Sequence, residues 1–151
     1  MNEVGPKGNG PLIEARGLNK NFGPVPALAG VDLELAGGQV IGLLGENGCG
    51  KTTLLKVLAG VMQDHGRVRI AGRRLGPETK ACVSFLPDAS YLKDSATVSQ
   101  CIKMFSDFFS DFRADKASDM IKFFGLAENM KLKQMSKGMR EKAQIALAMS
   151  R

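Results

Sequence analysis

Residues 45–52 read GENGCGKT and match the pattern G-x-x-x-x-G-K-[ST], which is typical of a loop that holds phosphate groups. Glycine lets successive backbone N–H groups form an anion-binding nest, and a helix that begins near Gly50 adds the positive end of its dipole. We expect Lys51 to contact the β- and γ-phosphates of a nucleotide and Thr52 to offer its hydroxyl to Mg²⁺. Thr53 can place a second hydroxyl near the α-phosphate. The sequence therefore predicts a nucleotide site that also holds Mg²⁺.

Cys49 lies inside this loop, where the helix N-terminus and Lys51 can make a thiol reactive. The alternative is that any small residue fits this turn, and we favour it. Cys82 and Cys101 bring the cysteines to an odd number, 3, without CxxC or Cys/His spacing. The sequence therefore indicates neither a disulfide framework nor a zinc site, and reduced thiols fit a cytoplasmic protein.

The elements that must position the loop follow the order strand, loop, helix. Residues 39–44 form an apolar run without alternation, as expected of a strand buried on both faces of a parallel sheet. Residues 51–59 have apolar side chains at helical spacing, and Gly60 is placed to end that helix. Further strands are predicted at 12–18, 29–35, 67–70 and 82–86.

After Pro87 glycine becomes rare and the apolar pattern changes to helical spacing. A first helix is predicted from an apolar face formed by Val98, Cys101, Ile102, Phe105, Phe108, Phe109 and Phe112. Further helices are predicted over 115–124, ending at Gly125, and over 136–151. The phenylalanines at 105–112 can form core or a docking groove for a membrane partner, and the helical spacing favours core.

The composition is that of an ordinary globular chain. Its 151 residues include 21 Lys and Arg against 15 Asp and Glu, a net charge of +6 that is a weak sign of polyanion binding. No apolar run reaches the roughly 18 residues of a membrane span, so we expect a soluble, cytosolic chain. The predicted organisation is a flexible leader at 1–11, a phosphate-binding core at 12–87, a helical subdomain at 88–135 and a final helix at 136–151.

The order of these motifs resembles the ATP-binding cassette (ABC) family, specifically the ATP-binding subunit of an ABC transporter. Residues 27–45, ALAGVDLELAGGQVIGLLG, are similar to the family's approach to its P-loop, and residues 18–23, LNKNFG, are similar to the segment with its adenine-stacking aromatic ring. The resemblance implies an α/β P-loop NTPase fold, with an ABC-type ATP-binding core and an inserted helical subdomain, and the cofactors ATP and Mg²⁺. It implies that the nucleotide-binding residues are Phe22, Gly45, Asn47, Gly48, Cys49, Gly50, Lys51, Thr52 and Thr53.

Two further segments support the resemblance. Residues 85–88, FLPD, occupy the place of the family's Q-loop, where Asp88 replaces the usual glutamine and would join Thr52 as a metal ligand. Its negative charge favours the metal but repels phosphate, and an Asp after Pro is equally typical of a plain turn. Residues 135–140, MSKGMR, resemble the signature motif LSGGQ.

The signature motif of the family faces the γ-phosphate held by a second subunit, which implies a head-to-tail dimer. The residues that would face the partner's nucleotide are Ser136, Lys137, Gly138 and Met139. Without the resemblance, a serine before an amphipathic helix is an ordinary N-cap, and we favour that interpretation of Ser136 on its own.

A further motif of the family is a hydrophobic strand that ends in Asp and is followed by Glu. This sequence does not contain it, so the resemblance implies a domain truncated before this Walker B strand. We expect a chain that binds Mg-ATP but hydrolyses it poorly and has no catalytic residue of its own. A strand at 39–44 without its sheet neighbours also predicts marginal stability or self-association.

The resemblance implies two protein partners, a second nucleotide-binding domain and a membrane-spanning transporter subunit, and a location on the cytoplasmic face of the membrane. The alternative is a soluble ABC-type ATPase with a regulatory or nucleic-acid-associated role. The basic run at 131–142 is compatible with that role, but we favour a solvated helix face and do not expect nucleic acid as a partner. The glycine spacing speaks against an NAD enzyme, and the lack of an N-K-x-D motif speaks against a GTPase.

Overall fold

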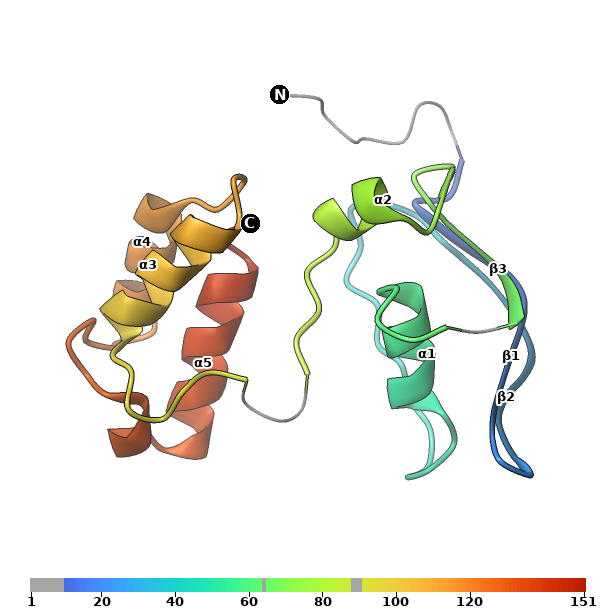
Figure 1. Cartoon of the computed structure of the whole chain (residues 1–151), viewed down its shortest axis with the longest axis horizontal. Coiled ribbons are helices and arrows are strands. Elements are labelled where there is room, and N and C mark those ends of the chain that lie inside the picture. The colour runs from blue at the N-terminus through green and yellow to red at the C-terminus, as the bar shows by residue number, and fades with distance from the viewer. Residues whose placement is uncertain (1–9, 64, 88–90) are drawn as a thin grey trace. The chain divides into compact units, whose positions relative to one another are not determined.

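The computed structural model describes residues 10–63, 65–87 and 91–151 (Figure 1). The chain forms two compact units, one that extends to Val83 and one from Ser84 to Arg151, and each is described by itself. The boundary predicted between residues 87 and 88 borders residues 88–90, which lie outside the described ranges, as does most of the predicted leader.

Unit 1 contains a four-stranded antiparallel sheet of β1 (Ile13–Phe22), β2 (Val25–Leu35), β3 (His65–Ile70) and β4 (Arg73–Arg74). The strand order is β2-β1-β3-β4, so β1 is central and forms a hairpin with β2. The predicted strands at 12–18, 29–35 and 67–70 are confirmed, and all three are longer than expected.

Helix α1 (Lys51–Leu58) supplies the other half of the core of unit 1 (Figure 1). Its buried side chains Leu54, Val57 and Leu58 pack against apolar residues of the sheet, so the helix is held in place on the strands. Gly60, in the left-handed region with φ 67°, follows the helix, as the sequence predicts.

The prediction of a buried strand at 39–44 is wrong. These residues form no strand, and Val40 and Leu44 are 105% and 92% exposed. A strand buried on both faces needs hydrogen-bonded neighbours, and no strand of the described residues pairs with this segment. Residues 39–44 therefore have the apolar pattern of a buried strand, but within the described residues no paired strands bury them.

The prediction of a strand at 82–86 is also wrong. Helix α2 (Pro77–Ala81) is followed by its C-cap Cys82, and residues 83–87 have no regular structure. The buried Thr79 holds the start of this helix, because its Oγ1 accepts a hydrogen bond from the Gly76 N–H at 2.9 Å. Proline at the first position of the helix favours the same conformation.

Unit 2 is helical, with α3 (Val98–Phe108), α4 (Ala114–Phe123), the 3₁₀ turn η1 (Leu132–Gln134) and α5 (Lys137–Ala148). All three predicted helices are confirmed with shifted ends, and Gly125 follows α4 with φ 70°. The three helices share one apolar core. Among the described residues, no helix combines the length and the apolar character needed to cross a membrane.

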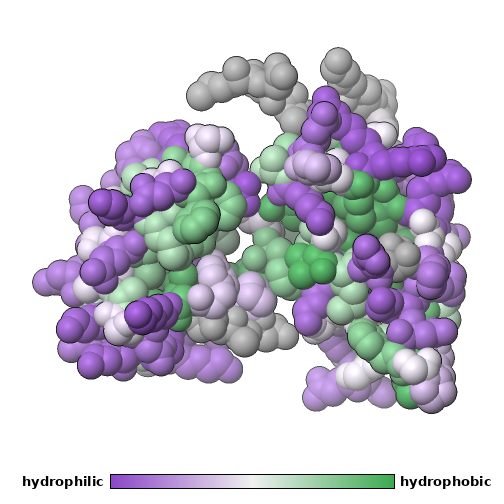
Figure 2. Space-filling model, viewed as in Figure 1, coloured by the Kyte–Doolittle hydropathy of each residue, from purple (hydrophilic) through white to green (hydrophobic). Residues whose placement is uncertain are grey.

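The phenylalanines of unit 2 pack mainly into its core. Phe105 is buried, and its ring centroid lies 5.4 Å from that of Phe109 and 5.5 Å from that of Phe112. Phe108 was expected on the same face but is 78% exposed, because α3 ends there and Phe109 is already extended. On the face seen in Figure 2, hydrophilic side chains cover most of each unit and apolar groups reach the surface in patches.

Candidate functional site

A cavity of about 330 Å³ lies in unit 1, at the β1–β2 hairpin and the start of α1. This volume falls at the lower end of the range for small-molecule sites. The residues that line it are Phe22, Val25, Pro26, Ala27, Asn47, Gly48, Gly50, Lys51, Thr52 and Thr53.

Most of the residues predicted to contact nucleotide meet at this cavity, and two do not line it, namely Gly45 and Cys49. The sequence reasoning missed Val25, Pro26 and Ala27. The feature that could have identified them is their position shortly after Phe22, where the hairpin returns toward the phosphate-type loop.

Gly50 joins the loop to the sheet by a close backbone approach. A Cβ at this position would lie 2.2 Å from the carbonyl oxygen of Ala27, and the residue has φ 92°, in the left-handed region. Only glycine fits both conditions. The loop therefore reaches α1 by passing directly against β2, which is how Ala27 comes to line the cavity.

The start of α1 presents backbone N–H groups without partners in the helix. The first turn of any α-helix leaves such donors, here on Lys51, Thr52 and Thr53. Gly50 precedes them and has no side chain to cap them, and no acidic residue lies in the first turn. Because the helix dipole is positive at this end, the site suits an anion.

The Lys51 ammonium lies within the loop. Its Nζ donates hydrogen bonds to the carbonyl oxygens of Gly45 at 2.7 Å and Glu46 at 2.5 Å, and lies 3.6 Å from the Sγ of Cys49. These contacts hold a full positive charge beside the free N–H groups of α1. The combination of a fixed cation and unpaired donors can bind a phosphate group.

The three thiols have different environments. Cys49 and Cys82 are exposed, whereas Cys101 is buried in the core of unit 2, where desolvation raises its pKa. A Cβ on Gly45 would lie 2.7 Å from the Cys49 sulfur, so that sulfur packs against the loop backbone.

Phe22 supplies the flat apolar surface of the cavity. It is the last residue of β1, pairs with Val25 across the hairpin and is 51% exposed. An exposed ring at the rim of a polar cavity can stack against a flat ligand such as a nucleobase.

The four predicted signature residues belong to unit 2 and are absent from the lining of the cavity in unit 1. Ser136 caps α5, because its Oγ accepts a hydrogen bond from the Met139 N–H at 3.3 Å, which confirms the N-cap interpretation. Lys137 is exposed and its Nζ lies 3.9 Å from Oε1 of Glu141, and a Cβ added at Gly138 would have no atom within 4 Å.

Substitution of Ser136 by alanine is expected to destabilise unit 2 by about 1 kcal/mol, because the N–H of Met139 loses its acceptor. The measurement is the urea-induced loss of helical circular dichroism. Ser136→Asp retains an acceptor at the cap and serves as the matched control, with a loss near zero. An equal loss in both variants would contradict the capping role.

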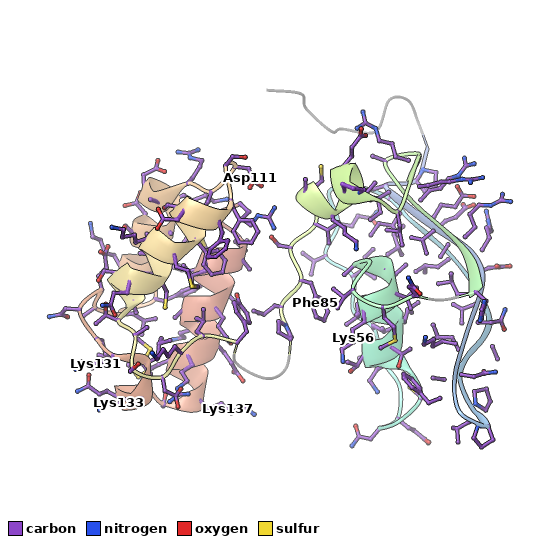
Figure 3. All side chains as sticks on the ribbon, in the orientation of Figure 1. Lys56, Phe85, Asp111, Lys131, Lys133 and Lys137 are labelled. Atoms are coloured by element: carbon purple, nitrogen blue, oxygen red, sulfur yellow. The ribbon has the colours of Figure 1, made fainter. Side chains whose placement is uncertain are left out.

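Three lysines of the basic run at 131–142 lie near one another in unit 2. Figure 3 shows Lys131, Lys133 and Lys137 beside η1 and the start of α5. Arg140 is paired with Asp94 at 2.7 Å. The exposed, partly paired side chains agree with the solvated face that the sequence favours.

For a metal ion, the described residues contain no cluster of three or more His, Cys, Asp or Glu side chains. Thr52, exposed at the cavity, offers one hydroxyl oxygen. Asp88, the other expected ligand, lies outside the described residues.

Comparison with known proteins identifies the family of this chain. The family model described as "ABC transporter" matches residues 28–151. The ribose import ATP-binding protein RbsA of Cereibacter sphaeroides is 41% identical over 100 residues, which are 62% of this chain and 20% of that protein. The Fe(3+) ions import ATP-binding protein FbpC of Mesorhizobium japonicum is 31% identical over 149 residues, which are 92% of this chain and 41% of that protein.

A solved structure titled "Structure of ATP binding subunit of ABC transporter" superposes with a TM-score of 0.79 at 26% identity, over 91% of this chain and 61% of that one. The chain thus spans between a fifth and about two fifths of the length of the two import proteins. Because the family model covers most of the sequence and the fold agrees, this chain belongs to the ABC transporter family and has the P-loop NTPase fold of its ATP-binding subunits.

Proposed function

We propose that the chain is an ATP-binding part of an ABC import system and that it binds Mg-ATP at the cavity of unit 1. The observation that supports this most is the uncapped start of α1 beside the Lys51 ammonium, at the bottom of a cavity rimmed by an exposed ring. The import role is proposed by analogy with the ribose and iron import relatives.

In this proposal the residues that the sequence predicts to bind nucleotide have the following tasks. The N–H groups of the loop and of the first turn of α1 bind the phosphates, together with Asn47, Gly48 and Gly50. Lys51 leaves the loop carbonyls and turns to the β- and γ-phosphates, and Thr53 offers its hydroxyl near the α-phosphate. Gly45 and Cys49 shape the loop from behind the lining. Phe22 stacks on the base.

The donor set also fits Mg²⁺. This ion prefers oxygen ligands and usually keeps several waters and substrate phosphates in its shell, so the Thr52 hydroxyl is a sufficient protein contribution at the cavity. Asp88 would add a carboxylate from the Q-loop position. When bound, the ion supplies charge neutralisation at the phosphates, which favours nucleotide binding.

The chain itself is proposed to bind ATP but to hydrolyse it poorly. Within the described residues, the cavity is lined by hydroxyl, amide, lysine, glycine and apolar groups, and by no carboxylate or imidazole that could activate a water molecule. The P-loop alone positions phosphates but does not orient the attacking water.

The whole system is proposed to pair two such domains head to tail. Ser136, Lys137, Gly138 and Met139, at the start of α5, would then face the nucleotide of a second copy or a similar domain. A membrane-spanning subunit would place the complex on the cytoplasmic face of a membrane. Copurification with a membrane protein, and not with nucleic acid, is the expected outcome in cells.

The proposal is tested by calorimetric titration of the chain with ATP and GTP in the presence of Mg²⁺. We expect one ATP to bind per chain with a dissociation constant below about 1 mM and phosphate release close to background. A strong preference for GTP would contradict the proposal, because a stacking ring tolerates either purine. Rapid steady-state hydrolysis would contradict the proposal that the chain hydrolyses ATP poorly because no residue at the cavity activates water.

A further inference from the structure

Lys20 is a second residue of β1 that contacts the Phe22 ring. Its Nζ lies over the ring at 5.9 Å from the centroid, within the range of cation–π attraction. Residues two apart on a strand project to the same side, which makes the contact a natural one for this spacing.

The Phe22 ring is the group that the Lys20 ammonium contacts. Lys20 is half-buried, and within the described residues no hydrogen bond or ion pair involves its side chain. Lys20 as a whole is half-buried and its ammonium lies over the Phe22 ring, so packing of the stem and the cation–π contact both favour this arrangement of the two side chains.

The cavity and the ammonium are different neighbours of the same ring. Phe22 lines the cavity, whereas Lys20 does not. The ring thus has two neighbours, the Lys20 ammonium 5.9 Å from its centroid and the cavity, which Val25 and Asn47 also line.

We infer that Lys20 is a positioning residue for the base of the bound nucleotide, which it serves by holding Phe22 in the orientation that stacks. This inference rests on the proposed function. Phe22 ends its strand and is 51% exposed, so without a second contact its ring would lose rotational freedom when a ligand stacks on it. The cation on one face removes part of that freedom before the ligand arrives.

The test compares ATP with inorganic tripolyphosphate, which shares the phosphates but has no base. Both are titrated into the full chain and into K20M and K20R. Removal of the charge in K20M is expected to weaken ATP binding about 2- to 5-fold, the range of an exposed cation–π contact, and to leave tripolyphosphate binding unchanged. K20R keeps a cation over the ring and is expected to restore ATP binding to within about 2-fold.

A double-mutant cycle separates positioning from a general effect. In an F22A background, K20M is expected to have no further effect on ATP binding, because the ring it acts on is gone. K103M removes a lysine charge from an exposed position on α3 and is the matched control, with no effect on either ligand. K20Q replaces K20M in the comparison if K20M does not fold.

Equal loss of ATP and tripolyphosphate affinity in K20M would overturn the inference, because Lys20 would then act on the phosphates. Unchanged ATP binding in K20M would overturn it as well, and the proposed function would stand. If the unaltered chain binds neither ligand, the proposed function and the inference fail together.

Discussion

Substitution of Lys51 by alanine is expected to weaken ATP binding about 100-fold and to leave the stability of the chain nearly unchanged. The ammonium donates to two loop carbonyls at 2.7 and 2.5 Å and would exchange these for phosphate oxygens when ATP binds. Charge-assisted hydrogen bonds contribute about 1.5–3 kcal/mol, and each 1.4 kcal/mol is tenfold in affinity. Calorimetric titration with ATP measures the loss.

Stability should change little because the two carbonyls can bond to water once the lysine is removed. Gly45 and Glu46 are both exposed, so the expected cost is about 0.5 kcal/mol or less in urea unfolding. A larger cost would mean that the ammonium is a structural part of the loop and that weaker binding reflects a collapsed site.

Lys56 provides the matched control. It lies on the same helix (Figure 3) and is not among the residues that line the cavity, and Lys56→Ala removes the same charge. ATP affinity is expected to stay within about twofold, because Lys56 does not line the cavity and salt screens charges that are not in direct contact. If both variants lose affinity equally, net charge and not the placement of Lys51 explains binding.

Four of the helices, α1, α3, α4 and α5, could be predicted from the sequence because their signals are local, whereas the short helix α2 and the end of α3 were missed. Glycine after α1 and after α4 takes a left-handed conformation, and Ser136 satisfies an N–H three residues away. The lysine and glycines of the phosphate-type loop are local in the same sense. Each of these features depends on a few neighbouring residues, which a sequence pattern contains completely.

Strands depend on partners that a local pattern does not identify. Residues 39–44 have the apolar composition of a buried strand, yet no strand of the described residues pairs with them. Residues 82–86 fail for the same reason. Phe108 was misplaced because the helical period continued in the sequence past the point where α3 ends.

The sequence predicted the residues of the site that have phosphate-binding or stacking chemistry, but not the residues that only line the cavity. Side chains with phosphate-binding or stacking chemistry stood out by type, whereas Val25, Pro26 and Ala27 have no such chemistry. Ala27 lines the cavity because its backbone lies against Gly50, and only the folded chain reveals that approach. The contact between Lys20 and Phe22 was also missed. A lysine two residues from a phenylalanine is common on exposed strands and gives no distinct signal in the sequence.

Gly50→Ala is expected to destabilise unit 1 by about 2–4 kcal/mol and to abolish most ATP binding. An alanine at φ 92° costs about 1–2 kcal/mol, and its Cβ would lie 2.2 Å from the Ala27 carbonyl oxygen. That oxygen belongs to the backbone of β2 and cannot rotate away, so the loop must leave the strand. The free energy of unfolding in urea and an ATP titration measure the two effects.

Gly48→Ala separates the two causes. Gly48 also has a positive φ, 85°, but no atom lies within 4 Å of the added Cβ. Only the backbone cost of about 1–2 kcal/mol is therefore expected, and the excess loss in Gly50→Ala is the contribution of the contact with Ala27. Equal losses in the two variants would mean that the loop relaxes around the new methyl group. In that case the approach to β2 would not be what holds the loop over the start of α1.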